Sequence, residues 1–334
     1  MSINTKLTQE EINQYYELIS QGLSQRQCCN VLGFSRGIIQ HYLKRVAELE
    51  NKEQTNPLVF ENNGHSFEFP NLVDSSHVIK KAIKPKKPTI CVIADTQCKP
   101  TESLEYILWM GRYIAEKKPD ILVMIGDFYD FPSLSSYDKG KASSEGRRFV
   151  DDLNAGNKGL ELLNLELSKD PTYQPRKVFC KGNHEYRVDR YVEDNPELKG
   201  TLGTEFLPLA QYGWEVYDFL NPVKIEDIYF VHYLANPMNG KPYGGNAMNI
   251  LKTVGCSYVV GHKQTLDIAI RPTIDGKLQI GIVNGAAYPF DEGYKGYQGN
   301  NHFRGITMLH ECHEGFGTPM FVSLDYMKDK YYAT

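Results

Sequence analysis

The sequence predicts a mixed α/β protein in which two packed β-sheets are flanked by helices, with a small helical unit ahead of them. Three observations favour this fold class. From residue 89 onward, continuous apolar runs of strand length alternate with helical segments. From about Thr265, short strands separated by turn residues indicate antiparallel pairing. The first 49 residues instead repeat apolar side chains at helical spacing.

Composition is that of an ordinary globular protein. Of the 334 residues, 41% are hydrophobic and 23% are charged, which leaves room for one large domain and a small one. No apolar run approaches the roughly 20 residues that a membrane span needs. The amino-terminal stretch lacks the basic start and apolar core of a signal peptide, so a cytoplasmic protein is expected.

Charge and cysteine content narrow the possible partners and cofactors. The net charge of −4 provides no overall attraction to nucleic acid, so any such binding must come from local patches. The seven cysteines lack CxxC spacing, which indicates reduced thiols rather than a disulfide framework or a zinc–thiolate cluster.

Residues 1–49 are predicted to form a separate domain of three helices. The expected helices are Leu7–Leu18, Ser24–Leu32 and Ser35–Leu49. Glycine turns separate them, and Gly33 ends the second. The stretch GLSQRQCCNVLGFSRGIIQHYLKR resembles the helix-turn-helix family in spacing.

The third helix of this unit would present polar and basic side chains to a groove of DNA. The candidate nucleic-acid-binding residues are Arg36, Gln40, Lys44 and Arg45. Acidic and basic residues balance in this unit, so the alternative is a three-helix bundle for protein contacts or dimerisation. Residues 50–88 are predicted to be a linker that ends in the basic, proline-broken segment KKAIKPKKP.

Residues 89–334 are predicted to form the α/β domain. Buried strands are expected in five runs: TICVIAD (89–95), ILVMIGD (121–127), KVFCKGN (177–183), IYFVHY (228–233) and YVVGH (258–262). Helices are expected from about residue 103 to 114, from about 144 to 167, and around 247 to 254. Asp275 and Gly276 are expected to make a β-hairpin turn.

Polar side chains recur where these strands stop. They are Asp95, Gln97, Asp127, Asp130, Asn183, His184, His232, His262 and Gln264. Ligand sites of parallel sheets lie outside the carboxyl ends of the strands. Carboxylates and imidazoles that converge there without a cation would repel each other or stay unsatisfied, and a pair of divalent ions removes both problems.

The order of these residues resembles that of the calcineurin-like metallophosphoesterases. The chain has D-x-Q, G-D-x-x-D, G-N-H-E, V-H and G-H-x-Q, where the family pattern is D-x-H, G-D-x-x-D, G-N-H-[DE], H and G-H-x-H. The resemblance covers residues 89 to about 310 and implies a four-layered αββα sandwich with a two-metal centre. The implied ligands are Asp127 for both ions, Asp95, Gln97 and Gln264 for the first, and Asn183, His232 and His262 for the second.

The same resemblance implies a reaction. His184 would protonate the leaving group or stabilise charge on the phosphoryl oxygens, and Glu185 would orient it. Asp130 is expected to support the loop of the bridging Asp127. Arg187 is a candidate to clamp a phosphate of the substrate, with a surface ion pair as the alternative. Two cations about 4 Å apart lower the pKa of a bridging water, so hydroxide becomes available near neutral pH.

We therefore expect a metal-dependent phosphoesterase that hydrolyses phosphodiester bonds, with nucleic acid as its substrate because of the helix-turn-helix resemblance. One alternative is a phosphatase or cyclic-nucleotide phosphodiesterase acting on small molecules. The other is a DNA-binding or scaffold protein that keeps a degenerate phosphoesterase fold.

Gln97 and Gln264 depart from the family pattern, which has histidines at both positions on the first metal. Oxygen ligands suit manganese and magnesium, whereas nitrogen ligands suit zinc and iron. We therefore expect Mn²⁺ or Mg²⁺ at the first site and Mn²⁺, Zn²⁺ or Fe²⁺ at the second. The competing interpretation is a first site that has lost its metal.

Overall fold

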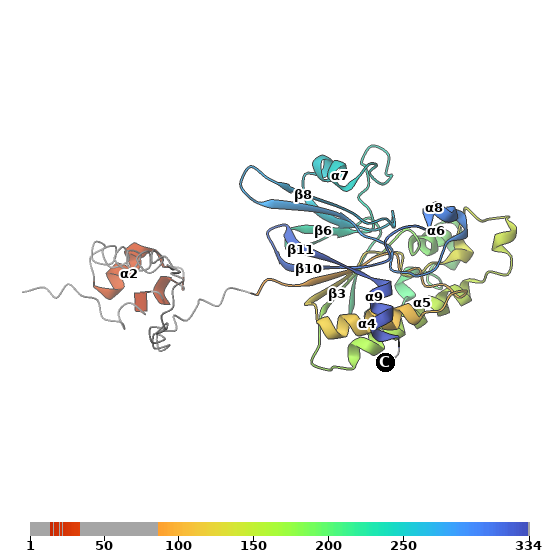
Figure 1. Cartoon of the computed structure of the whole chain (residues 1–334), viewed down its shortest axis with the longest axis horizontal. Helices are drawn as coiled ribbons and strands as arrows, with labels where there is room; N and C mark the ends of the chain where they lie inside the picture. Colours follow the sequence, from red (N-terminus) through yellow and green to blue (C-terminus); the bar gives the residue numbers. More distant parts are fainter. Residues whose placement is uncertain (1–13, 16, 20, 22, 34–85, 333–334) are drawn as a thin grey trace, which may run out of the picture. The chain divides into compact units, whose positions relative to one another are not determined.

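The computed structural model describes residues 14–15, 17–19, 21, 23–33 and 86–332 (Figure 1). The chain divides into two units, residues 1–80 and residues 81–334, which are described separately. Within the described residues, no helix is both long enough and apolar enough to cross a membrane.

The described part of the first unit is built around helix α2, Gln25–Leu32. The Ser24 N–H donates to Gln27 Oε1 at 2.9 Å, and Gly33 ends the helix in the left-handed region at φ 71°. This confirms the second of the three predicted helices. The third, with Arg36, Gln40, Lys44 and Arg45, lies outside the described residues, as does nearly all of the linker.

The second unit contains two β-sheets. The first sheet has the strand order β11-β10-β1-β2-β3-β4, in which β1 to β4 are parallel and β10 and β11 are antiparallel additions. Its strands are β1 (Ile90–Ile93), β2 (Ile121–Met124), β3 (Arg176–Cys180), β4 (Trp214–Tyr217), β10 (Gly305–His313) and β11 (Phe316–Ser323).

The second sheet has the order β5-β6-β7-β9-β8, with β6, β7 and β9 parallel. Its strands are β5 (Val223–Ile225), β6 (Ile228–Val231), β7 (Ser257–Val260), β8 (Asp267–Pro272) and β9 (Leu278–Val283). The predicted hairpin turn is present between β8 and β9, with Gly276 at φ 81°. The expected antiparallel tail is only partly right, because β9 also pairs parallel to β7 and thereby buries Ile280 and Ile282 between the sheets.

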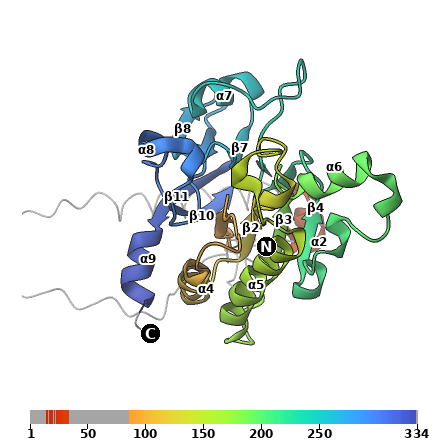
Figure 2. The ribbon, with the colours of Figure 1, turned by 90° about the vertical axis from the view of Figure 1, so that its right-hand side faces the viewer.

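Helices cover the outer face of each sheet (Figures 1 and 2). Helices α4 (Glu105–Lys117), α5 (Phe149–Ser168) and α9 (Leu324–Tyr331) lie against the first sheet, and α7 (Ala247–Val254) packs on β8 and β9 of the second. The four layers are those of the expected αββα sandwich. Helix α5 begins later than expected, because Gly146 at φ 75° makes a turn after the short 3-10 helix Ala142–Ser144.

Burial on both faces explains the uninterrupted apolar strands. In β1, Ile90 and Val92 pack between the two sheets, whereas Cys91 and Ile93 pack against the helical layer. A strand whose two faces are both covered needs apolar residues at every position. The polar residues of the predicted site begin where this double cover ends.

Candidate metal centre

The site lies at the carboxyl ends of five parallel strands drawn from both sheets. Asp95, Asp127 and Asn183 follow β1, β2 and β3 of the first sheet, and His232 and His262 follow β6 and β7 of the second. Because the two sheets pack face to face, residues that are far apart in sequence meet at one edge. The structure thus brings the predicted residues together across the interface between the sheets.

The backbone of this edge is strained. Five non-glycine residues of the site lie in the left-handed region: Asp95 (φ 48°), Gln97 (φ 49°), Asp127 (φ 53°), His262 (φ 65°) and Gln264 (φ 59°). Such a conformation costs on the order of 1–3 kcal/mol per residue and persists only where the surroundings impose it. Several strained residues clustered just after the ends of strands are typical of a functional site.

Two glycines permit the close approach of the first sheet's loops. A Cβ on Gly182 would lie 2.2 Å from Asp127 Oδ1, and a Cβ on Gly126 would lie 2.8 Å from His232 Nδ1. Any side chain at either position would displace the Asp127 carboxylate or the His232 ring. Gly126 of the G-D motif and Gly182 of the G-N motif are therefore required because neighbouring atoms of the site leave no room for a side chain.

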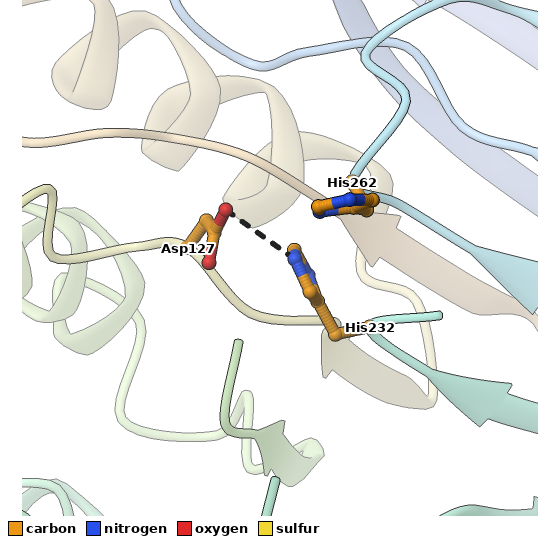
Figure 3. Close-up of side chains that lie close together, drawn as sticks. All are labelled: Asp127, His232 and His262. Atoms are coloured by element: carbon orange, nitrogen blue, oxygen red, sulfur yellow. Dashed lines mark ion pairs between the residues drawn. The ribbon is translucent and has the colours of Figure 1, made fainter. Parts of the chain in front are cut away.

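Asn183, His232 and His262 form one side of the centre, which we call the histidine side, and their donor atoms converge on a single point. His232 Nδ1 donates to the Ile125 carbonyl at 2.9 Å, which leaves its lone pair on Nε2. The Asn183 Oδ1 atom lies 2.8 Å from His232 Nε2 and 2.8 Å from His262 Nδ1. The Asp127 Oδ2 atom lies 3.3 Å from His232 Nε2 (Figure 3).

Electrostatics at this point favour a cation. Burial lowers the pKa of His262 to about 4, so this imidazole is neutral and able to bind a metal. Burial also acts to lower the pKa of His232, but the Asp127 charge outweighs it and raises that pKa to about 9. A positive charge is therefore stabilised at His232 Nε2, where a proton and a metal ion compete. Asp127, Asn183, His232 and His262 together fit one divalent ion with two nitrogen and two oxygen donors.

Asp95, Gln97 and Gln264 form the other side of the centre, which we call the glutamine side. It contains a buried carboxylate and a side-chain amide without a hydrogen-bond partner among the described residues. Asp95 is fully buried, its Oδ2 accepts from the His262 N–H at 2.9 Å, and burial raises its pKa to about 6. Gln97 is only 1% exposed, and neither polar atom of its amide has a partner among the described residues. Native structures rarely bury an amide without a partner. Asp95, Gln97 and Asp127 thus fit a second ion.

Gln264 does not fit the ligand role that the sequence predicts. Its Oε1 accepts from the Tyr288 hydroxyl at 2.8 Å and from Lys295 Nζ, and its Nε2 faces Asp95 Oδ1 at 3.4 Å. The end of the amide that faces the centre is a donor, which cannot bind a cation. Gln264 instead connects Asp95 to Tyr288 and Lys295.

His184 stands beside the metal ligands. Its Nε2 lies 3.5 Å from Asp127 Oδ2, and its Nδ1 lies 2.8 Å from Asp130 Oδ1. Arg187 Nη2 lies 2.8 Å from the same Nε2, while Arg187 Nη1 donates to the Asp130 carbonyl at 2.8 Å. An imidazole and a guanidinium therefore meet at the edge of the centre.

The sequence matches the calcineurin-like phosphoesterase family over residues 88–272. This chain belongs to the calcineurin-like phosphoesterase family. Membership supports a hydrolase of phosphate esters with a centre for two divalent ions, and the donor sets on the two sides of Asp127 agree with that.

Solved structures add little to the family assignment. A dimetal phosphatase from Danio rerio is 10% identical, covers 72% of this chain and 99% of its own, and has a TM-score of 0.35. A second crystal structure is 11% identical over 71% of this chain and 99% of its own, with a TM-score of 0.36. No curated protein matches the sequence.

Two acidic residues of this phosphoesterase exchange the roles expected from the sequence. Glu185 is expected to orient His184, but its buried carboxylate accepts from four backbone N–H groups, those of Gly182, Asp127, Phe128 and Tyr129, at 2.7–2.9 Å. The left-handed turn at Asp127 leaves the N–H groups of Asp127, Phe128 and Tyr129 without sheet partners, and Glu185 accepts hydrogen bonds from them. Asp130, expected to support the loop, is the carboxylate beside His184.

The sequence motifs of this phosphoesterase do not reveal Tyr288 and Lys295. These residues follow the last motif by 24 and 31 residues, and nothing in the stretch AAYPFDEGYKGYQGN resembles a ligand pattern. The only signal is negative: a glutamine at position 264, where the family has a histidine, needs other partners for its amide.

Proposed function

We propose that this chain is a metal-dependent phosphodiesterase that acts on nucleic acid. The hydrolytic part rests on one observation, the convergence of Asn183, His232 and His262 on a point beside Asp127 with His184 next to it. Packing alone does not explain this set of donors, because buried lone pairs that converge on one point need a proton or a metal ion between them.

Divalent ions, when bound, supply Lewis acidity and lower the pKa of water. The chain's residues then position the substrate. His184 and Arg187 face the same place from one side of Asp127, and both can donate to oxygens that gain negative charge. Asp130 Oδ1 lies 2.8 Å from His184 Nδ1, so its negative charge stabilises the protonated form of the imidazole. Arg187 donates to the Asp130 and Phe131 carbonyls, which fixes its guanidinium.

Nucleic acid as the substrate is supported by two features. The sequence of residues 1–49 has helix-turn-helix spacing with basic residues on its third predicted helix. At the catalytic unit, Tyr294 and Tyr297 are 76% and 88% exposed and flank Lys295, which reaches Gln264. Exposed aromatic rings beside a phosphate site offer faces on which bases stack.

A substrate panel with the purified protein and Mn²⁺ tests this proposal. Bis-(p-nitrophenyl) phosphate, p-nitrophenyl phosphate, single-stranded DNA and double-stranded DNA are compared at equal concentrations. We expect the diester and DNA to be hydrolysed faster than the monoester. Preference for the monoester would replace the proposal with a small-molecule phosphatase, and no hydrolysis at all would favour a binding protein.

The amino-terminal unit is tested in the full chain with Arg36, Lys44 and Arg45 changed to alanine together. We expect DNA binding to weaken. Its salt dependence should also fall, because a protein that makes fewer phosphate contacts releases fewer counterions from DNA when it binds. Hydrolysis of the small diester should not change. Equal DNA binding by the variant and the unmodified chain would remove the main support for a nucleic-acid substrate.

A further inference from the structure

A lysine from late in the chain reaches the glutamine side of the centre. Lys295 ends the 3-10 helix Gly293–Lys295, and its Nζ donates to Gln264 Oε1 and to the Tyr288 hydroxyl, the latter at 2.8 Å. The Tyr288 hydroxyl donates to the same Gln264 oxygen at 2.8 Å. The three polar groups form a closed ring of hydrogen bonds.

This ring is attached to the metal centre through one amide. The Gln264 Nε2 faces Asp95 Oδ1 at 3.4 Å, so the Lys295 ammonium is separated from Asp95 by the width of the Gln264 amide. Burial lowers the pKa of Lys295, and the charge of Asp95 acts against that effect. The ammonium therefore lies within electrostatic range of the Asp95 carboxylate.

The charge of Lys295 is not neutralised by a carboxylate. Within the part of the chain that the structure describes, no ion pair joins Lys295 to an acidic group, although acidic residues lie close to it in sequence. Glu292 is paired with Lys99 at 2.8 Å, and Asp291 is paired with Arg304. The carboxylates of this segment are thus paired with other cations, and none of them forms an ion pair with Lys295.

Packing alone does not account for this lysine. Tyr288 and Gln264 already satisfy each other through the hydroxyl, so neither needs the ammonium as a partner. Placing an ammonium without a counter-ion in a partly buried position costs free energy. An ammonium has three N–H donors, and the ring uses two of them.

We propose that Lys295 is a phosphate-binding residue of this centre, held in place by Gln264 and Tyr288. Its third N–H donates to a non-bridging oxygen of the phosphoryl group on the Asp95 side. The family has a neutral imidazole at position 264, whereas this chain uses Gln264 to hold a full positive charge near the same place. Gln264 and Tyr288 are positioning residues in this arrangement. The inference rests on the proposed function, because it assumes a phosphate ester as the ligand.

Inorganic phosphate is the probe, because its binding can be measured without turnover. Calorimetric titration of the Mn²⁺-loaded full-length chain is compared for the unmodified protein, Lys295→Met and Lys252→Met. Lys252 is an exposed lysine on α7 and serves as the control for loss of one positive charge. We expect Lys295→Met to weaken phosphate binding by roughly 10- to 100-fold, the loss typical of a hydrogen bond from a charged group. The control should bind like the unmodified protein.

Two further measurements separate binding from structure. Lys295→Arg should retain most of the phosphate affinity, because it keeps the charge, and an added small alkylammonium ion should partly restore Lys295→Met. Metal content, measured by mass spectrometry, should be the same in all variants. Tyr288→Phe should raise KM for the diester by severalfold and change kcat less, because it loosens the lysine without removing it.

Equal phosphate affinity in Lys295→Met and Lys252→Met would overturn the inference, as would failure of the unmodified protein to bind phosphate. A gain of one metal ion per chain in Lys295→Met would also overturn it, since the lysine would then be excluding an ion. Failure of the proposed function looks different: the unmodified protein would bind phosphate through Lys295 but hydrolyse no ester in the substrate panel.

Discussion

The two sides of the metal centre have different donor groups and differ in how completely those groups are oriented for binding a metal ion. On the histidine side, the His232 tautomer is fixed by the Ile125 carbonyl, and Asn183 Oδ1 lies 2.8 Å from nitrogens of both histidines. On the glutamine side, the side-chain amide of Gln97 has no hydrogen-bond partner among the described residues, and Gln264 is held by Tyr288 and Lys295.

The difference shows what an imidazole provides and an amide does not. A neutral imidazole with one nitrogen hydrogen-bonded to the backbone has a single directed lone pair left. An amide has a donor end and an acceptor end, so neighbouring hydroxyl and ammonium groups can capture the acceptor. A histidine-to-glutamine change therefore alters both the ligand and the set of residues around it.

Asp127 is common to both sides, and its removal should have the largest effect. A neutral amide in Asp127→Asn cannot offset the charge of two divalent ions, so turnover and metal content should be lost together. Metal content by mass spectrometry and hydrolysis of bis-(p-nitrophenyl) phosphate check this. Near-normal activity in the variant would refute a centre that shares this carboxylate.

His184 belongs to neither ligand set, so its loss should separate catalysis from metal binding. His184→Ala should retain its metal and lose roughly 10²–10⁴ in turnover, the range for general acid–base catalysis. If the histidine protonates the leaving oxygen, nitrophenyl esters should suffer less than esters with poor leaving groups. An equal loss for both would assign it to stabilising charge on the phosphoryl oxygens, as its contact with Arg187 suggests.

The unequal preparation of the two sides predicts unequal retention of metal. During dialysis against metal-free buffer, the ion on the glutamine side should leave first, because Gln97 offers only a neutral oxygen and Gln264 faces the centre with a donor. Gln97→Ala should raise the Mn²⁺ concentration needed for activity by roughly tenfold, whereas His262→Ala should lose the tightly held ion. Two ions retained with equal affinity would contradict the comparison.

Substitutions of Glu185 and Asp130 should have the smallest effects, and they test which of the two carboxylates supports the loop and which lies beside His184. Glu185→Gln places an amide against four backbone donors, so the free energy of unfolding should fall by about 1–3 kcal/mol in urea titrations. Asp130→Asn should instead reduce turnover with little loss of stability, since its carboxylate serves His184. Reversal of these two outcomes would restore the roles inferred from the sequence.

Chain order alone is enough to predict the layers and the histidine side of the centre. Uninterrupted apolar runs indicate strands covered on both faces, and β1, β2, β3, β6 and β7 occupy the predicted segments. The carboxyl ends of such strands meet at one edge, so the amino-acid sequence groups Asp95, Asp127, Asn183, His232 and His262 at a single site. Local order is sufficient for this, because each polar residue directly follows its strand.

The polar partner that each side chain takes depends instead on tertiary structure. Glu185 and Asp130 are both acids near His184 in the motifs, and the choice between their roles depends on where the turn at Asp127 directs its N–H groups. Lys295 and Tyr288 cannot be found from the motifs at all, since no spacing links them to Gln264. A hydrogen bond forms between groups that folding brings within about 3 Å, and the chain order of residues 95, 264 and 295 holds no information about that distance.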